Sequence, residues 1–99
     1  FVRNALIDAA NSVGATIIGE SFHRFQPIGV TGVVAIAESH LCIHTWPEYS
    51  YAAVDIFTCG TAFSPREAAK LLIQSFEAKD PSILEIERGK LAELATVAR

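Results

Sequence analysis

Residues 32–48 of the chain read GVVAIAESHLCIHTWPE, and this stretch decides the fold and the place of a candidate site. Its first six residues, 32–37, form an apolar run that is typical of a buried strand. From Glu38 to Glu48 the composition changes, because two histidines, a cysteine, a serine, a tryptophan and two carboxylates stand within eleven residues. A polar group buried in a strand must find a partner or costs about 1–3 kcal/mol. We therefore interpret residues 38–48 as a functional site.

The elements around this stretch follow from local sequence signals. Residues 33–37 and 41–46 are predicted strands joined by a tight turn at 38–40, and Pro47 ends the second strand because proline cannot donate to a ladder. Upstream, residues 15–25 are strand-like and residues 26–29 form a turn containing Pro and Gly. Downstream, residues 51–58 form a strand that is closed by Cys59 and Gly60.

Helices are predicted on both sides of these strands. Residues 2–13 carry apolar side chains at helical spacing, and Gly14 is a natural C-terminal cap. Ser64, Pro65 and Glu67 form a strong helix start, and the helix runs to about Lys79, before Asp80 and Pro81. A last strand is expected at 83–87, and residues 91–99 are expected to be a short helix or a frayed end. The order helix, four strands, helix, strand predicts a two-layer α+β sandwich with a mainly antiparallel sheet and the helices on one face.

The composition limits the classes of function. With 99 residues the chain is expected to be one domain, of a size at which oligomerisation helps stability. A net charge of −3 without a cluster of Lys or Arg argues against nucleic acid as a partner. No apolar run reaches the roughly 18–20 residues of a membrane helix. Two cysteines without a secretory signal favour a reducing compartment, the cytoplasm, while a disulfide between Cys42 and Cys59 is the alternative.

The motif as a whole resembles a known family. Glu-Ser-His-Leu-x-Ile-His-Thr-Trp-Pro-Glu at 38–48, followed by Tyr-x-x-x-Asp-x-Phe-Thr-Cys-Gly at 51–60, is similar to the prokaryotic S-adenosylmethionine decarboxylase proenzymes. The similarity covers residues 15–60 and, more loosely, 87–89. It implies a pyruvoyl enzyme that cleaves its own chain between Glu38 and Ser39 and converts Ser39 into the pyruvoyl cofactor. The resemblance also implies that decarboxylation of S-adenosylmethionine supplies the aminopropyl donor for spermidine and other polyamines. The family carries a strand ahead of the first helix, which this sequence does not show.

The resemblance implies a role for eight residues. They are Ser39 as the pyruvoyl precursor, Glu38 with the carbonyl at the cleavage site, His44 as the processing base, Thr31 as a support for cleavage in place of the relatives' serine, Cys59 as the proton donor, Phe25 and Trp46 near the adenine, and Glu48 on the ribose hydroxyls. A neutral imidazole suits a base near pH 7, and a thiol with a pKa around 8.5 remains protonated enough to donate. No metal is expected, because the three histidines show no zinc spacing.

Strand alternation adds a constraint of its own. On a regular strand His44, Trp46 and Glu48 share one face, while Ser39 lies on the other. A sharp turn at 38–40 could return Ser39 to His44 within one subunit. The other solution, which we expect, is a homodimer with two composite sites. Each takes Ser39 and Cys59 from one subunit, and Phe25, Thr31, His44 and Glu48 from its partner; larger relatives that look like two fused copies favour this arrangement.

Other readings stay open at this point. The same scaffold can act on arginine or ornithine, although an aromatic pair and a carboxylate suit a nucleoside better. A non-processing binding subunit is the alternative from a different class. His40 is equally well explained as a group that satisfies turn backbone. Cys42 is interpreted as a small buried residue rather than as a catalyst. Asp55 shares a strand face with Cys59 and either orients the site or belongs to a neighbouring network.

Overall fold

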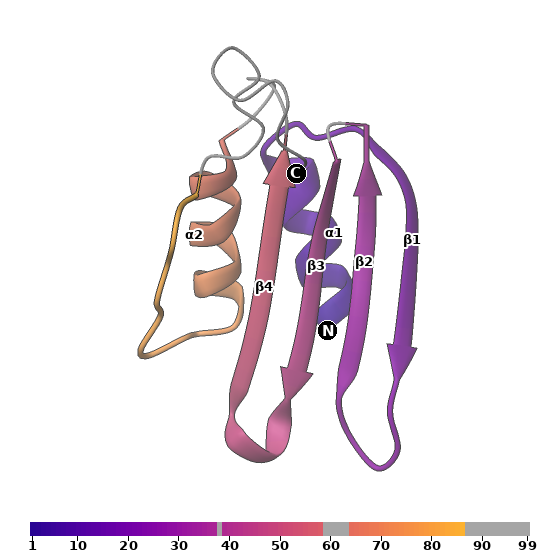
Figure 1. Ribbon diagram of the computed structural model, residues 1–99, viewed down its shortest axis with the longest axis vertical. Coiled ribbons are helices and arrows are strands. Elements are labelled where there is room, and N and C mark those ends of the chain that lie inside the picture. The colour runs from indigo at the N-terminus through magenta and orange to yellow at the C-terminus, as the bar shows by residue number, and fades with distance from the viewer. Residues whose placement is uncertain (38, 59–63, 87–99) are drawn as a thin grey trace, which may run out of the picture.

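The computed structural model describes residues 1–37, 39–58 and 64–86 (Figure 1). Among these residues, two α-helices and four strands form two layers, with α1 behind the sheet and α2 next to α1 along the β4 side (Figure 1). The sheet is antiparallel throughout and its strand order is β1-β2-β3-β4. In chain order the elements are α1 (Val2–Ser12), β1 (Ile17–Arg24), β2 (Val30–Ile36), β3 (Ser39–Trp46), the short 3-10 helix η1 (Pro47–Tyr49), β4 (Tyr51–Thr58) and α2 (Pro65–Ser75). This arrangement confirms the predicted α+β sandwich with helices on one face.

The core lies between the sheet and the helices. The strands bury alternate residues: Val34 and Ile36 on β2, and Leu41 and Ile43 on β3. Because successive strand residues point to opposite faces, this alternation turns the even residues of β3 away from the core. The helices add the small and branched residues Ala5, Leu6, Ala9, Ala10, Ala68 and Leu72.

Two of the three predicted helix-end signals are confirmed. Gly14 adopts φ +81° after α1, a left-handed conformation that glycine enters without strain, and its N–H donates to the carbonyl of Asn11 at 3.1 Å. The Ser64 hydroxyl accepts from the backbone N–H of Glu67 at 3.3 Å at the start of α2. The predicted end at Lys79 is wrong, because α2 stops at Ser75 and Glu77 takes a left-handed φ of 51°.

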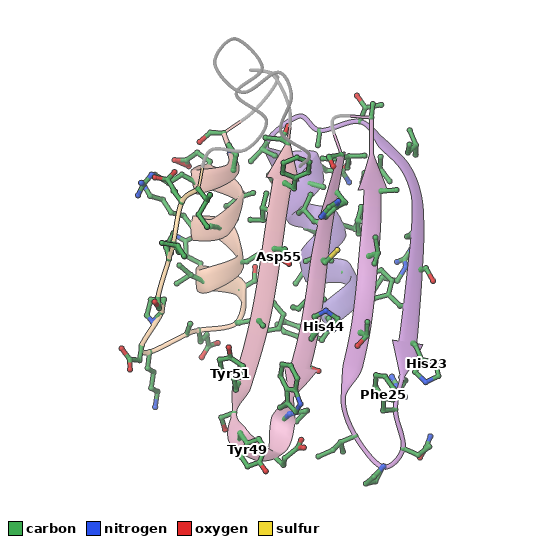
Figure 2. All side chains as sticks on the ribbon, viewed as in Figure 1. His23, Phe25, His44, Tyr49, Tyr51 and Asp55 are labelled. Carbon is green, nitrogen blue, oxygen red and sulfur yellow. The ribbon has the colours of Figure 1, made fainter. Side chains whose placement is uncertain are left out.

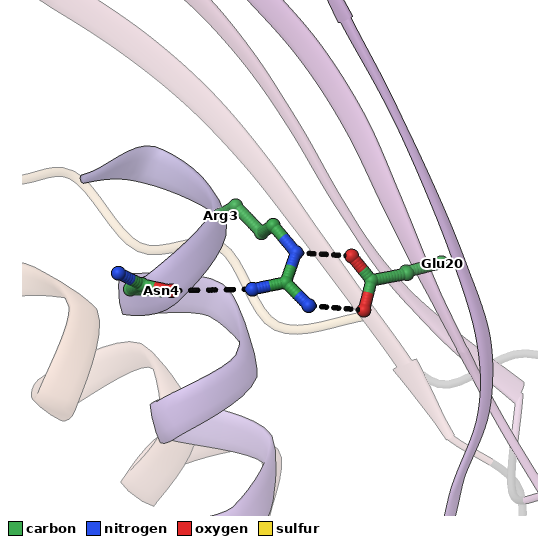
Figure 3. A network of polar contacts seen from close by, with 3 residues as sticks. All are labelled: Arg3, Asn4 and Glu20. Carbon is green, nitrogen blue, oxygen red and sulfur yellow. Dashed lines mark hydrogen bonds and ion pairs between the residues drawn. The ribbon is translucent and has the colours of Figure 1, made fainter.

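An ion pair joins α1 to the edge strand β1 (Figure 3). The Arg3 guanidinium meets the Glu20 carboxylate with both Nε and Nη2, the latter at 2.7 Å, and Nη1 also donates to Asn4 Oδ1 at 3.3 Å. The hydrogen bond to Glu20, reinforced by its charge, raises the pKa of Arg3. The contact therefore ties the first turn of the chain to the sheet.

Three strand boundaries differ from the sequence prediction. β3 begins at Ser39, within the predicted turn, because Ser39 already pairs with Ile36 of β2 and with Thr58 of β4. Only residues 37 and 38 separate the paired residues Ile36 and Ser39, so the hairpin is tighter than expected. β2 begins at Val30 rather than at residue 33, and β1 is shorter than the predicted 15–25.

The predicted strand at 83–87 is wrong over residues 83–86. This segment is not assigned to the sheet, and its apolar side chains are largely exposed, with Leu84 at 82%. Leu84 and Ile86 instead border a cavity beside His40 and Phe57, without pairing their backbone with a strand. Residue 87 and the predicted element at 91–99 lie outside the described residues.

Candidate active site

The face of the sheet opposite the helices carries the polar and aromatic residues of the motif. We call this surface the open face. By strand alternation and register it holds Thr31 and Val33 of β2, His40, Cys42, His44 and Trp46 of β3, and Tyr51, Asp55 and Phe57 of β4. Figure 2 shows His44, Asp55 and Tyr51 on this side of the sheet.

Thr31 and His44 form a hydrogen-bonded pair on the open face. They stand directly opposite each other on β2 and β3, and Thr31 Oγ1 lies 3.0 Å from His44 Nδ1. His44 is otherwise exposed. When Nδ1–H donates to the hydroxyl, the lone pair of the neutral ring is on Nε2, where it can accept a proton. In that tautomer the contact orients the imidazole and leaves Nε2 available to another group.

An aromatic row continues from His44 toward the hairpin between β3 and β4. The ring centroids of His44 and Trp46 are 6.3 Å apart, and those of Trp46 and Tyr51 are 5.5 Å apart with an interplanar angle of 32°. Trp46 remains 39% exposed. Such a row offers a surface for a planar ring or a cation. The sequence did not predict a role for Tyr51, because its position beside Trp46 depends on the register of β3 with β4.

Phe25 and Glu48 lie near the same end of the sheet, but outside the strands. Phe25 follows β1, is 47% exposed, and packs against His23 with ring centroids 4.5 Å apart (Figure 2). Glu48 is exposed in η1. The prediction that strand alternation places Glu48 with His44 is wrong, because β3 ends at Trp46 and Pro47 begins the 3-10 helix.

Ser39 lies at the opposite end of β3. It pairs with Thr58, the residue directly before Cys59, and its hydroxyl lies 3.3 Å from His40 Nδ1. Within the described part of the chain, Thr58 Oγ1 is a buried hydroxyl without a hydrogen-bond partner, which no sequence signal indicated. The two remaining predicted residues of this end, Glu38 and Cys59, lie outside the described residues.

One chain does not bring Ser39 and His44 together. His44 lies five residue steps beyond Ser39 on β3, which corresponds to about 17 Å at the usual rise of a strand. They also fall on opposite faces by alternation. The regular strand thus contradicts the alternative in which a sharp turn returns Ser39 to His44 of the same subunit.

Cys42 lies between these two ends, opposite Asp55. It is a half-buried free thiol, and burial, followed by the negative charge of Asp55, raises its pKa. The prediction that it is a small packed residue agrees with this environment. Among the described residues, no group of three or more His, Cys, Asp or Glu could hold a metal ion. The described helices are also too short or too polar to cross a membrane.

Comparisons with known proteins show the family to which this chain belongs. The family model described as S-adenosylmethionine decarboxylase matches residues 1–89. A relative from Thermodesulfovibrio yellowstonii, an S-adenosylmethionine decarboxylase proenzyme, is 59% identical over 88 residues, which are 89% of this chain and 65% of the relative. The chain belongs to the S-adenosylmethionine decarboxylase family. The resemblance seen in the motif at 38–60 is thereby confirmed.

Further family members support the assignment. The proenzyme of Acidithiobacillus ferrooxidans is 50% identical over 91 residues, or 92% of this chain and 68% of that protein. The crystal structure of the adenosylmethionine decarboxylase from Aquifex aeolicus is similar with a TM-score of 0.72 and 35% identity, and the match covers 90% of this chain and 79% of that one. This chain thus spans about two thirds of the length of the first two relatives.

Proposed function

We propose that this protein is a self-processing, pyruvoyl-dependent decarboxylase of S-adenosylmethionine that supplies the aminopropyl donor for spermidine and other polyamines. The observation that carries the proposal is the Thr31–His44 hydrogen bond on the open face of a chain that belongs to this family. The relatives' description as proenzymes supports self-processing. The free thiol of Cys42 suits the cytoplasm, which we propose as the location.

Self-processing needs a nucleophile and a base, and Ser39 and His44 fit these tasks. The Ser39 hydroxyl adds to the carbonyl carbon of Glu38, and the peptide C–N bond breaks to give an ester. His44 then removes the Cα proton of residue 39, and elimination releases Glu38 as a carboxylate and leaves dehydroalanine. Water converts this species into ammonia and an N-terminal pyruvoyl group. A neutral imidazole held by Thr31 suits the proton removal near pH 7.

The mature site requires groups that bind a nucleoside sulfonium. The pyruvoyl group supplies an electron-withdrawing ketone for loss of CO₂. Trp46, its neighbour Tyr51 and Phe25 offer aromatic surface to the adenine and to the sulfonium cation, and Glu48 offers a carboxylate to the ribose hydroxyls. Cys59 would protonate the substrate carbon after CO₂ leaves. The aromatic row and Glu48 together favour S-adenosylmethionine, because arginine and ornithine carry neither an adenine to stack nor ribose hydroxyls to bind.

We further propose that two subunits form the site. Ser39 and Cys59 come from one subunit, while Phe25, Thr31, His44 and Glu48 come from its partner. The separation of about 17 Å along β3 supports this division, since no single chain joins the two ends. A twofold homodimer that places the Ser39 end of one β3 beside the His44 end of the other would create two equal sites.

The proposal is tested by the mass of the purified protein and by CO₂ release. We expect two fragments divided between Glu38 and Ser39, the second beginning with pyruvoyl, and CO₂ from S-adenosylmethionine but not from arginine or ornithine. The Ser39→Ala variant is the matched control and should remain one chain. A single uncleaved chain after long incubation would contradict the proposal and favour a non-processing binding subunit. CO₂ from arginine or ornithine alone would contradict the substrate.

A further inference from the structure

The Ser39 hydroxyl has a closer histidine than His44. Its Oγ lies 3.3 Å from Nδ1 of His40, the next residue in the chain. That distance is long for a hydrogen bond between a hydroxyl and a ring nitrogen, yet catalytic hydrogen bonds are often long before the reacting groups are aligned. His44 is about 17 Å away on the same strand and faces the other side of the sheet. Within one chain, His40 is therefore the imidazole positioned at the nucleophile.

The surroundings of His40 suit proton exchange. The ring is half-buried and lies beside Phe57, with ring centroids 5.7 Å apart at an interplanar angle of 44°. It borders an open cavity of about 240 Å³ whose wall also includes Asp55, Leu84 and Ile86. The aromatic neighbour limits the positions of the imidazole, while the cavity gives the ring access to water. Among the described residues that line this cavity, the ionisable side chains are those of His40 and Asp55.

The first step of self-processing requires proton transfers that His44 of the same chain is too far away to make. The hydroxyl must lose its proton as Oγ bonds to the carbonyl carbon of residue 38. The amide nitrogen of residue 39 must then gain a proton as the C–N bond breaks. One imidazole can do both, because Nδ1 takes the hydroxyl proton and the resulting imidazolium gives a proton to the departing nitrogen. The product is an ester with a free α-amine, and the histidine returns to its neutral form.

We propose that His40 is a catalytic residue that performs these transfers on Ser39 of its own chain, while His44 removes the Cα proton in the later elimination. This inference rests on the proposed function. It assigns the two histidines of the motif to two successive steps and to two different subunits. It also explains why a histidine directly follows the serine, a position that the motif alone left equally well explained as a turn residue.

The test compares His40→Asn, His40→Ala and His44→Ala by cleavage rate and by hydroxylamine, which cuts an ester but leaves a peptide bond intact. In the asparagine variant an amide oxygen takes the place of Nδ1, so the hydrogen bond to Ser39 is kept but no proton can be carried. We expect both His40 variants to process at least about a hundredfold more slowly than the parent and to resist hydroxylamine. His44→Ala should accumulate the ester and be cut by hydroxylamine at residue 38.

Added imidazole should restore cleavage of His40→Ala, with a rate that follows the neutral fraction of imidazole as the pH changes. The inference is overturned if His40→Asn processes within about threefold of the parent, or if either His40 variant accumulates a hydroxylamine-sensitive ester. Circular dichroism and size-exclusion chromatography check that the variants keep the parent fold. If the parent itself stays uncleaved, the proposed function fails; if the parent cleaves and His40→Asn matches it, only the role of His40 fails.

Discussion

At the scale of single residues, the contact between Thr31 and His44 links the fold to the proposed chemistry. The motif predicted both residues, but not that the threonine hydroxyl would lie 3.0 Å from Nδ1. This contact depends on the register of β2 with β3, which places the two residues directly opposite each other. We therefore propose that Thr31 acts on processing by positioning His44.

Removing the Thr31 hydroxyl should slow processing. Thr31→Val keeps the shape of the side chain but loses a hydrogen bond worth about 0.5–1.5 kcal/mol, so we expect a cleavage rate roughly three- to tenfold lower. Thr31→Ser keeps the hydroxyl and should process at the parent rate or faster. Gel analysis of chain cleavage over a range of pH measures both rates. Equal rates for the valine and serine variants would show that the hydrogen bond does not orient the base.

The charge of Asp55 should control the reactivity of Cys42. Asp55 adds to burial in raising the pKa of the thiol, so Asp55→Asn lowers that pKa and increases the thiolate fraction at neutral pH. Alkylation of Cys42 by iodoacetamide at pH 7.5, followed by peptide mass mapping, should therefore be faster in the variant. The difference in alkylation rate should shrink as the pH rises above the pKa that the Cys42 thiol has in the parent and in the variant. An unchanged alkylation rate would mean that Asp55 does not act on the thiol.

At the scale of elements, local signals predicted most of the fold but not its register. Gly14 and Ser64 marked helix ends because each satisfies backbone groups by itself. The strand at 83–87 was predicted from apolar residues alone, and the structure leaves residues 83–86 unpaired with the sheet. Contacts such as Trp46 with Tyr51 and Ser39 with His40 depend on strand pairing and on side-chain rotation, which a sequence pattern does not contain.

The close contact between β1 and β2 gives a stability prediction. Phe22 lies across Gly32 in register, and a Cβ on Gly32 would stand 2.1 Å from the Phe22 ring. Gly32→Ala should therefore lower the free energy of unfolding by about 1–3 kcal/mol, as overpacking does. Gly19→Ala on β1 is the matched control, because nothing lies within 4 Å of its added Cβ.

Urea denaturation measures both glycine variants, in the Ser39→Ala background so that a single uncleaved chain unfolds. We expect the control to stay within about 0.5 kcal/mol of its parent, as surface substitutions usually do. Similar stability losses in the two variants would contradict the close packing of Phe22 on Gly32.

At the scale of the whole molecule, one chain holds Ser39 and His44 apart, and we propose that a second subunit completes the site. The helices cover one side of the sheet, while the other side presents Trp46, Tyr51 and His44 to solvent. Ser39 and His44 are about 17 Å apart on a regular strand, and the sequence predicted this conflict from alternation alone. The sequence could not predict how two subunits would meet, because the pattern of one strand does not contain a dimer interface. We expect the homodimer to resolve the conflict.

A mixed dimer tests this central claim most directly. A Ser39→Ala chain and a His44→Ala chain, coexpressed with different tags and purified through both, retain one site that has Ser39 from one chain and His44 from the other. The account predicts that the His44→Ala chain is cleaved and gains the pyruvoyl group, that the Ser39→Ala chain stays intact, and that neither homodimer is cleaved. If neither chain is cleaved in a verified mixed dimer, the shared site is contradicted.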